Sequence, residues 1–481
     1  MKISSNPLSP KGIWSGSLPN VMDLFIVLIF ASVSFLCFDQ AFDMRLTMIQ
    51  SSDLLDCVFN GTPFHFYQHV LDKAVGGAYF GLNETSTVAI YNIILYSSLA
   101  IWLLPIYVLN HVTHLVIYEA LINLWGRVLV ISISLICAVV IRRFYIKLFS
   151  DPVKAKWAGY FFISSPLVLY CVVITDQFDI IPTILTLLAL FFYFDKKYYK
   201  FSILMSLTIC FKLFPLLIFF PLIFLVEKRL QKLFQYSAIA VALYAVTSIA
   251  SSLFDTGYNQ MQKIAQVQHG YFDRIYTAQI PGGIKNISLF LLCMILICTF
   301  AYYIKVSEID LPMVAFLFCA ASYASLFTFV LWEPQWFILI LPFFIFIVFR
   351  MKNFVTGVLL ETMISAGFLL VSVPIFLVRQ HMTTSVLVAL TKNIFSIPEH
   401  LYLPSLYFKQ LGEGVLPMSI FVGFMAAFLL IAYKDYRSGI PADDSFTKDI
   451  RTVRILLYFR SSLILIYILP PLIAYFSTPA M

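Results

Sequence analysis

Long apolar runs separated by short polar breaks fill most of the chain. The runs are nearly free of charged residues, and their apolar positions do not alternate with polar ones as they would along a membrane barrel strand. About 20 residues at a rise of 1.5 Å cross a hydrocarbon layer of about 30 Å. Because backbone polar groups inside lipid must bond within their own segment, the pattern predicts membrane-spanning helices. The runs are 24–38, 88–109, 121–141, 157–174, 234–254, 286–304, 311–331, 335–349, 353–377, 415–433 and 455–475.

Composition supports the same interpretation. Of the 481 residues, 61% are hydrophobic and 12% are charged, about half the charged share of a soluble domain. Segment 200–226 is too long for one span and indicates two short helices, 201–211 and 216–226, joined by a turn at 212–215. We therefore predict an all-α, polytopic transmembrane bundle that forms a single domain, 1–481, with roughly 11 to 13 spans.

Other signals in the sequence are weak. The first run is followed by Asp39-Gln40 without a small-residue cleavage site, so we expect a retained helix and no cleaved signal peptide. The eight cysteines form no CxxC and no Cys/His cluster, so we expect neither disulfides nor a metal site. No Gly-rich phosphate cradle is present, and nothing points to nucleic acid.

The charged residues predict the orientation of the bundle. Lys and Arg collect in the cytoplasmic loops of membrane proteins. The basic clusters, expected inside together with Lys2 and Lys11, are Arg142-Arg143 with Lys147, Lys154 and Lys156; Lys196-Lys197 with Lys200; Lys228-Arg229 with Lys232; Arg350 with Lys352; and Lys434, Arg437, Lys448, Arg451 and Arg454. Most acids lie in the remaining breaks, which predicts outer segments 39–112, 255–285 and 378–414 and an inner loop 435–452.

One run conflicts with this orientation. If 24–38 and 88–109 both cross the bilayer, the Arg142 cluster falls on the outer face. Either 88–109 is a re-entrant or surface-lying hairpin broken near Pro105, or the N-terminus lies outside. Lys2 and Lys11 favour the hairpin.

The first polar candidate is Asp43, in Phe42-Asp43-Met44-Arg45 beyond the first run. Charges at membrane depth are costly and are candidates for function. Burial at the bilayer edge can raise the pKa of such a carboxyl, which makes Asp43 a candidate general base toward a sugar hydroxyl. The alternative is a solvated loop acid, as Asp53 and Asp56 further along would be.

The second candidate group is Asp176-Gln177-Phe178-Asp179, at the junction of two expected helices. Two acids three residues apart at helical spacing face the same way and suit binding of substrate hydroxyls or a metal. Alternatively, Asp179 is an N-cap, because a helix with Pro182 near its start follows.

Two more groups lie further along the chain. Lys212, in Phe211-Lys212-Leu213-Phe214-Pro215, would pair with a phosphate or extend to the membrane surface. In Trp332-Glu333-Pro334-Gln335-Trp336, Glu333 and Gln335 would contact a sugar and Trp336 would stack on it, unless the indoles only anchor the helices. Candidate contacts for a lipid phosphate are Arg274 and Arg379; Arg127, His269, Lys285, His381, Lys392 and Lys409 are weaker ones.

In this order, the four groups resemble the GT-C superfamily of integral membrane glycosyltransferases, nearest to bacterial polyprenyl-phosphate-sugar transferases and GPI first-mannose transferases. That family has an acid after the first helix, a Gly-Gln-x-Asp or Gly-Asn-x-Asp turn, a Lys-x-x-Pro and a Pro-Gln-aromatic. The similarity covers about 40–350. The matching positions are Asp43 with Gly61 and Phe66-Tyr67; Asp176 to Asp179, with Asp176 in place of the Gly; Lys212 to Pro215; and Pro334-Gln335-Trp336.

The resemblance implies an inverting hexosyltransferase that uses a polyprenyl-phosphate-linked sugar, with mannose one candidate, and needs no cofactor. Asp43 would be the base, and the other residues of the four groups would bind substrate. The implied partners are membrane lipids, the lipid-linked donor and a cell-surface glycan or lipid acceptor on the extracytoplasmic face. The Lys-, Phe- and Ile-rich composition suggests a bacterial plasma membrane.

Two other functions remain open. A lipid-linked sugar flippase or transporter would place charges near the midplane and often shows two related halves, which are not visible here. A polysaccharide polymerase or ligase would share the outer active face but use a lipid-diphosphate oligosaccharide.

Overall fold

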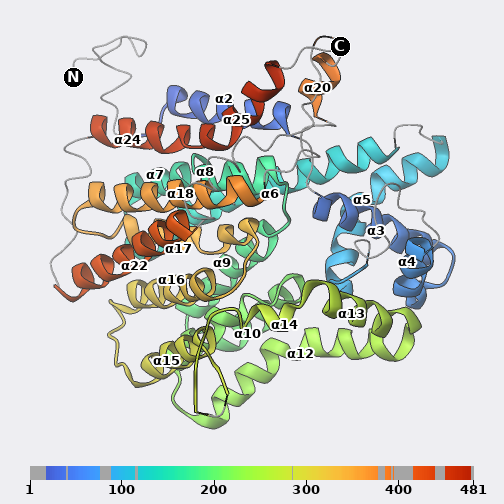
Figure 1. Ribbon diagram of the computed structural model, residues 1–481. Coiled ribbons are helices and arrows are strands. Elements are labelled where there is room, and N and C mark those ends of the chain that lie inside the picture. The colour runs from blue at the N-terminus through green and yellow to red at the C-terminus, as the bar shows by residue number, and fades with distance from the viewer. Residues whose placement is uncertain are drawn as a thin grey trace, which may run out of the picture.

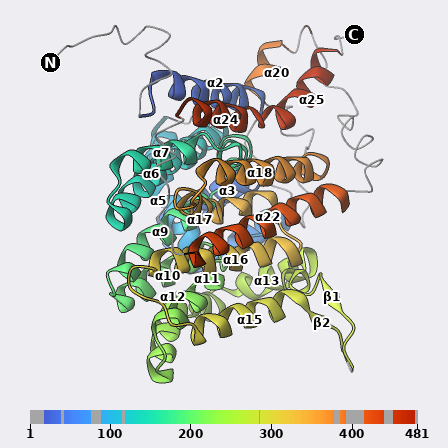
Figure 2. The same cartoon turned by 90° about the vertical axis from the view of Figure 1, so that its left-hand side faces the viewer.

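The computed structural model of the chain describes residues 18–38, 42–75, 88–113, 118–283, 285–376, 385–391, 394, 415–438 and 450–477. Nearly all secondary structure in these ranges is helical (Figure 1). The exception is a two-stranded antiparallel pair, β1 (Gln279–Ile280) and β2 (Ile287–Ser288), which precedes α15 (Figure 2). The predicted all-α bundle is confirmed.

Eight helical segments of the described chain are long and apolar enough to cross a membrane. This number identifies a multi-pass membrane protein. They lie within α5 (Ile93–Thr113), α6 (Tyr118–Phe149), Pro152–Ile174, α12 (Leu230–Phe254), α16 (Leu311–Phe329), α18 (Phe354–Phe376), α22 (Val415–Arg437) and Ile450–Pro470. Shorter apolar helices are α2 (Val21–Cys37), α9 (Ile180–Phe194), α10 (Tyr198–Phe211), α11 (Leu216–Val226), α15 (Leu289–Tyr303) and Pro334–Val348.

Several of these segments contain breaks, and the remaining elements are short. The broken segments are α7 (Pro152–Ile163), α8 (Pro166–Val168) and the π-helical turn η3 (Leu169–Ile174); the 3-10 helix η4 (Pro334–Leu339) and α17 (Leu341–Val348); and α24 (Ile450–Ser462) and α25 (Leu465–Phe476). The other elements are α3 (Phe42–Phe59), η1 (Pro63–His65), α4 (Phe66–Val75), α13 (Thr256–His269), α14 (Tyr271–Arg274) and α20 (Val386–Thr391).

The core lies where the broken segments cross the middle of the bundle. The segments of α7 to η3 and of η4 to α17 are almost wholly buried, whereas α12 buries only Leu233, Tyr236 and Ala240 and borders the bundle. The predicted division of 200–226 is confirmed, because α10 ends at Phe211 and α11 begins at Leu216. A proline just before α11 suits the first turn of a helix, where its missing N–H has no partner to lose.

Basic residues gather at one end of the bundle. Lys147 at the end of α6 and Lys197 both contact Asp195, which follows α9. Lys196 contacts Glu308, just before α16. We call this the basic end. It brings together clusters that the sequence placed on one side of the membrane.

The opposite ends of the same helices carry a different set of side chains. Asp179 precedes α9 and Lys212 follows α10, so both lie about 20 Å along these helices from the basic end. Asp43 in the first turn of α3 and Glu333 at the start of η4 lie near them. We call this the acidic end.

Helix α5 is continuous through Pro105, so the predicted break there is wrong. Pro105 is exposed, whereas Leu103 and Tyr107 on either side of it are buried. The missing N–H therefore removes one hydrogen bond on the exposed face of the helix and leaves its packed face unchanged.

Two hydrogen-bonded contacts, one just before α5 and one within it, lie at the acidic end. Asn92 donates a hydrogen bond to Thr247, and Trp102 and Trp125 each donate an indole N–H to the carbonyl of the other. Thr247 is near the end of α12 and Trp125 is near the start of α6. Since α12 begins and α6 ends at the basic end, both contacts are at the opposite side. In Figure 1, α3, α4 and α5 gather on the right of the bundle.

The last helices are joined to the core by two fully buried ion pairs that the sequence did not predict. Arg454 pairs with Asp23 of α2 at 3.4 Å, and Arg460 forms a bidentate pair with Glu361 of α18. The sequence grouped Arg454 with the cytoplasmic basic residues, and its side chain is buried in this ion pair. Arg454 lies within α24 and faces α2, a helix from the other end of the chain.

Parts of the predicted loops lie outside the described residues. These are 39–41 and 76–87 of the first outer segment, most of 378–414 including Arg379, and 439–449 of the loop 435–452. The segment 255–285, predicted as an outer loop, consists mainly of α13, α14 and β1.

Candidate functional site

An ion pair between Lys212 and Asp179 forms the centre of the acidic end. The Lys212 Nζ atom lies 3.1 Å from Asp179 Oδ1, and the Asp179 side chain is wholly buried while that of Lys212 is 10% exposed. Asp179 precedes α9, but its side chain makes no capping hydrogen bond to that helix. The N-cap interpretation of Asp179 is therefore wrong for its carboxylate, which faces Lys212.

Aromatic rings surround the Lys212 ammonium. Its Nζ atom lies 5.1 Å from the ring centre of Phe178, 5.4 Å from Tyr91, 5.7 Å from Trp336 and 6.0 Å from Phe214. Ring faces attract a cation, and they are worth more where water is excluded. The rings and Asp179 hold Lys212 inside the bundle rather than extended to its surface.

A second ion pair lies beside the first. Arg274 Nη1 lies 3.0 Å from Glu333 Oε1, and the guanidinium carbon lies 5.8 Å from the ring centre of Trp336. The same indole approaches Lys212, so Trp336 is near both cations. Trp336 is buried within η4, and it links the pairs instead of serving only as an anchor at the membrane surface.

Asp43 completes the group from the first turn of α3. Burial raises the pKa of the half-buried Asp43 carboxyl above its usual range. Lys212 and Arg274 oppose this rise, and the negative charges of Glu333 and Asp179 add to it. Because each of these four groups affects the charge state of Asp43, all five residues share one electrostatic environment. Asp43, Asp179 and Lys212 therefore belong to one interacting group.

The turn before α9 differs from the prediction. Asp176 and Asp179 are not on one helical face, because the chain between η3 and α9 is a turn in which Asp176 has φ +46°. Asp176 pairs with Arg127 of α6 at 2.6 Å, and Asp179 pairs with Lys212. The two acids therefore bind different cations. A positive φ suits Gly best and is tolerated by Asp, so Asp176 can adopt the backbone conformation of this turn.

The side-chain amides of Gln177 and Gln335 lie close to this group. Gln177 is buried, its backbone N–H donates to the carbonyl of Cys171, and its side-chain Oε1 accepts no hydrogen bond among the described residues. Gln335 is buried in η4 between Glu333 and Trp336. An unpaired buried amide oxygen is costly, which makes Gln177 suitable for a ligand with a hydroxyl donor.

The roles of two residues at the site, Arg127 and Tyr91, were not predicted from the sequence. Arg127 was a weak candidate for a lipid phosphate, but it lies over the Phe35 ring at 3.9 Å and neutralises Asp176. Its charge within an otherwise apolar run was the available signal, although its partner was not predictable. Tyr91 lies in a segment without any motif and gave no signal. Arg379 lies outside the described residues.

We predict that Asp176→Ala destabilises the protein by about 1–2 kcal/mol more than Asp176→Gly does, because only Ala has a Cβ to strain the left-handed backbone. Both variants lose the pair with Arg127, so the comparison isolates the backbone term. Thermal unfolding of the two purified variants measures it. Equal unfolding temperatures would contradict a strained turn at this position.

No known family model matches this sequence, and a search of curated proteins found no similar chain.

Proposed function

We propose that the chain is a membrane glycosyltransferase that transfers a hexose from a polyprenyl-phosphate donor to a cell-surface glycan or lipid acceptor. The observation that supports this most is the position of Asp43, a carboxyl with a raised pKa beside two cations, Lys212 and Arg274. A general base next to a site for an anionic leaving group is what transfer from a sugar phosphate requires.

Asp43 acts as the base in this proposal. Its carboxylate accepts the proton of an acceptor hydroxyl while the hydroxyl oxygen forms a bond to the anomeric carbon of the donor. The bond from that carbon to the phosphate oxygen breaks on the opposite face, so the anomeric configuration inverts and the lipid phosphate leaves with the bonding electrons. A raised pKa brings the carboxyl nearer to neutral pH, where a general base is most effective.

Lys212 and Arg274 stabilise the leaving phosphate. Each cation faces one carboxylate, so the two ion pairs are together neutral. The Arg274–Glu333 pair is the more exposed of the two, with Glu333 at 32%, so Arg274 is the cation that exchanges its carboxylate for the donor phosphate. The Trp336 indole, near both cations, would contact the sugar ring.

The orientation of the site follows from the charges at the other end of the bundle. Lys147, Lys196 and Lys197 gather there, and basic clusters favour the cytoplasmic side. The acidic end is then extracytoplasmic. A lipid-linked donor in the outer leaflet reaches such a site without a nucleotide sugar. A bacterial plasma membrane fits this arrangement.

The direct test uses the purified full-length chain in lipid nanodiscs. Polyprenyl-phosphate donors carrying different radiolabelled hexoses are supplied with extracted cell-surface glycans and lipids. Transfer of label to an acceptor, with release of polyprenyl phosphate, supports the proposal. Movement of intact labelled lipid across a proteoliposome without transfer would favour a flippase, and use of lipid-diphosphate oligosaccharides alone would favour a polymerase.

We predict that Lys212→Ala lowers kcat/KM for the donor roughly 10- to 100-fold, as expected for loss of about 1.5–3 kcal/mol from a bond to a charged group. Lys212→Arg retains a cation beside Asp179 and should be affected less. Steady-state kinetics at varied donor concentration measure both. Unimpaired activity in the two variants would remove Lys212 from phosphate binding.

A further inference from the structure

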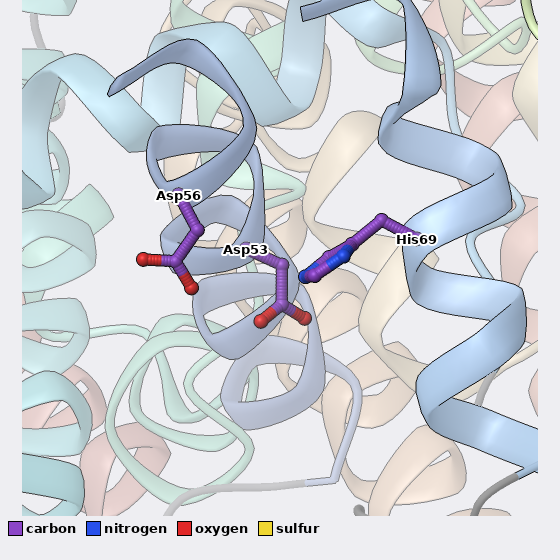
Figure 3. Close-up of side chains that lie close together, drawn as sticks. All are labelled: Asp53, Asp56 and His69. Atoms are coloured by element: carbon purple, nitrogen blue, oxygen red, sulfur yellow. The ribbon is translucent and has the colours of Figure 1, made fainter. Parts of the chain in front are cut away.

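Three metal-ligating side chains meet between α3 and α4, apart from the group around Asp43 (Figure 3). They are Asp53, Asp56 and His69, and one ligand atom from each lies within 4.8 Å of the other two. Asp53 is about 15 Å further along α3 than Asp43, so the cluster is distinct from the proposed transfer site.

Helical spacing explains why these side chains converge. Asp53 and Asp56 are three residues apart and lie on one face of α3, opposite His69 on α4. Tyr107 of α5 donates its hydroxyl to Asp56 Oδ1 at 2.7 Å. Such an outer hydrogen bond fixes the orientation of a carboxylate, as is common for metal ligands.

The imidazole of His69 provides a second, independent observation. Its Nε2 atom is buried from solvent and has no hydrogen-bond partner among the described residues. Figure 3 shows the ring directed toward Asp53. A buried ring nitrogen without a partner carries a desolvation cost, which a bond to a metal ion would offset.

Lys73 is a cation that already contacts both carboxylates of the cluster. Its Nζ atom is 2.5 Å from Asp53 Oδ1 and 3.7 Å from Asp56 Oδ2, and about a third of its side chain is exposed. Its single positive charge therefore bridges the two carboxylates. The lysine is long, flexible and partly exposed, so it can turn toward solvent when a divalent ion takes its position.

We propose that Asp53, Asp56 and His69 bind a divalent transition-metal ion, with Zn²⁺ as the best fit. Imidazole together with carboxylates suits zinc, whereas Ca²⁺ and Mg²⁺ prefer oxygen ligands alone. Ligand atoms around tetrahedral zinc are roughly 3.3 Å apart, so small side-chain rotations would contract the observed cluster onto the ion. Three protein ligands leave a fourth position for water.

The bound ion would crosslink α3 and α4 and so stabilise the helix that carries Asp43. This role does not depend on the proposed glycosyl transfer, because no reacting group lies at the cluster. Binding of the ion would change the stability and the metal content of the protein.

The test titrates Zn²⁺ into the chelator-treated full-length protein in nanodiscs, with metal content and thermal unfolding as measurements. The wild type should bind one zinc ion per chain and unfold at a higher temperature with zinc. His69→Ala should weaken binding by at least about tenfold. The exposed His65 provides the matched control, since His65→Ala leaves the three ligands in place and should bind as the wild type does.

Lys73→Met makes the test more specific. Removing the competing ammonium should tighten zinc binding, whereas a purely structural Lys73 salt bridge predicts no gain. Failure of the wild type to bind zinc would overturn the proposal, as would unchanged affinity in His69→Ala. Glycosyl-transfer activity is not a readout here, so this result stands apart from the test of Asp43.

Discussion

Asp43→Asn is expected to reduce sugar transfer by about 10²- to 10⁴-fold, the usual contribution of a general base. The amide has nearly the same shape as the carboxyl but cannot accept the proton of the acceptor hydroxyl. Asp43 is half-buried in the first turn of α3, so the variant should insert and fold normally. Initial rates with a polyprenyl-phosphate hexose donor, corrected for the amount of folded protein, measure the loss.

Asp72→Asn is the matched control for this substitution. Asp72 is exposed on α4 and contacts Gln68, away from Lys212 and Arg274. It should retain wild-type turnover. A well-folded Asp43→Asn protein with normal turnover would end the assignment of Asp43 as the base.

The pH dependence of the wild type provides a second check on the same residue. The base must be deprotonated to act, and burial raises the pKa of Asp43. Activity should therefore increase as the pH rises through this raised pKa and then level off. The residual activity of Asp43→Asn should lack that rise. A wild-type profile that is flat from acid to neutral pH would contradict a raised pKa at the reacting group.

Glu361→Ala is expected to lower the free energy of unfolding by about 3–5 kcal/mol, the typical cost of leaving one partner of a buried ion pair without the other. Arg460 is fully buried and also donates to the carbonyl of Phe161 and lies over the Phe161 ring. Its guanidinium cannot lose its charge, so nothing compensates the lost carboxylate. Thermal unfolding in detergent measures the loss.

Two further variants distinguish this cause from a simple packing defect. Glu308→Ala removes an exposed partner of Lys196 and should cost about 1 kcal/mol or less. The double variant Glu361→Leu with Arg460→Met replaces both charges by apolar groups and should recover much of the stability. A double variant as unstable as Glu361→Ala would mean that packing, and not the unpaired charge, causes the loss.

The helices and the convergence of Asp43, Asp179 and Lys212 could be predicted because local patterns determine them. Apolar runs of spanning length identify helices, and Lys212 with Pro215 marks the turn between α10 and α11. Each polar group stood at a helix end. After two consecutive helices the chain is again on the same side of a membrane. Residues at alternate breaks were therefore expected to meet.

The partners of the buried charges could not be predicted in this way. Arg460 and Glu361 each interrupt an apolar run, which signals a functional or paired charge, but neither position says which helix it faces. Arg454 stood next to a polar loop and had the same pattern as a cytoplasmic cation. The left-handed backbone of Asp176 was also not predictable, since Asp is compatible with a helix, a cap or a turn.

The pair between Asp23 and Arg454 has a consequence for biosynthesis. The two residues are 431 positions apart, one in the first described helix and the other in α24. At 5–20 residues per second, a ribosome needs roughly 20 to 90 s to travel from one to the other. Throughout that interval the first helix holds an acid whose cation has not been made. Nascent chains should therefore keep this helix accessible to insertion factors, and its final docking should be among the last events of assembly.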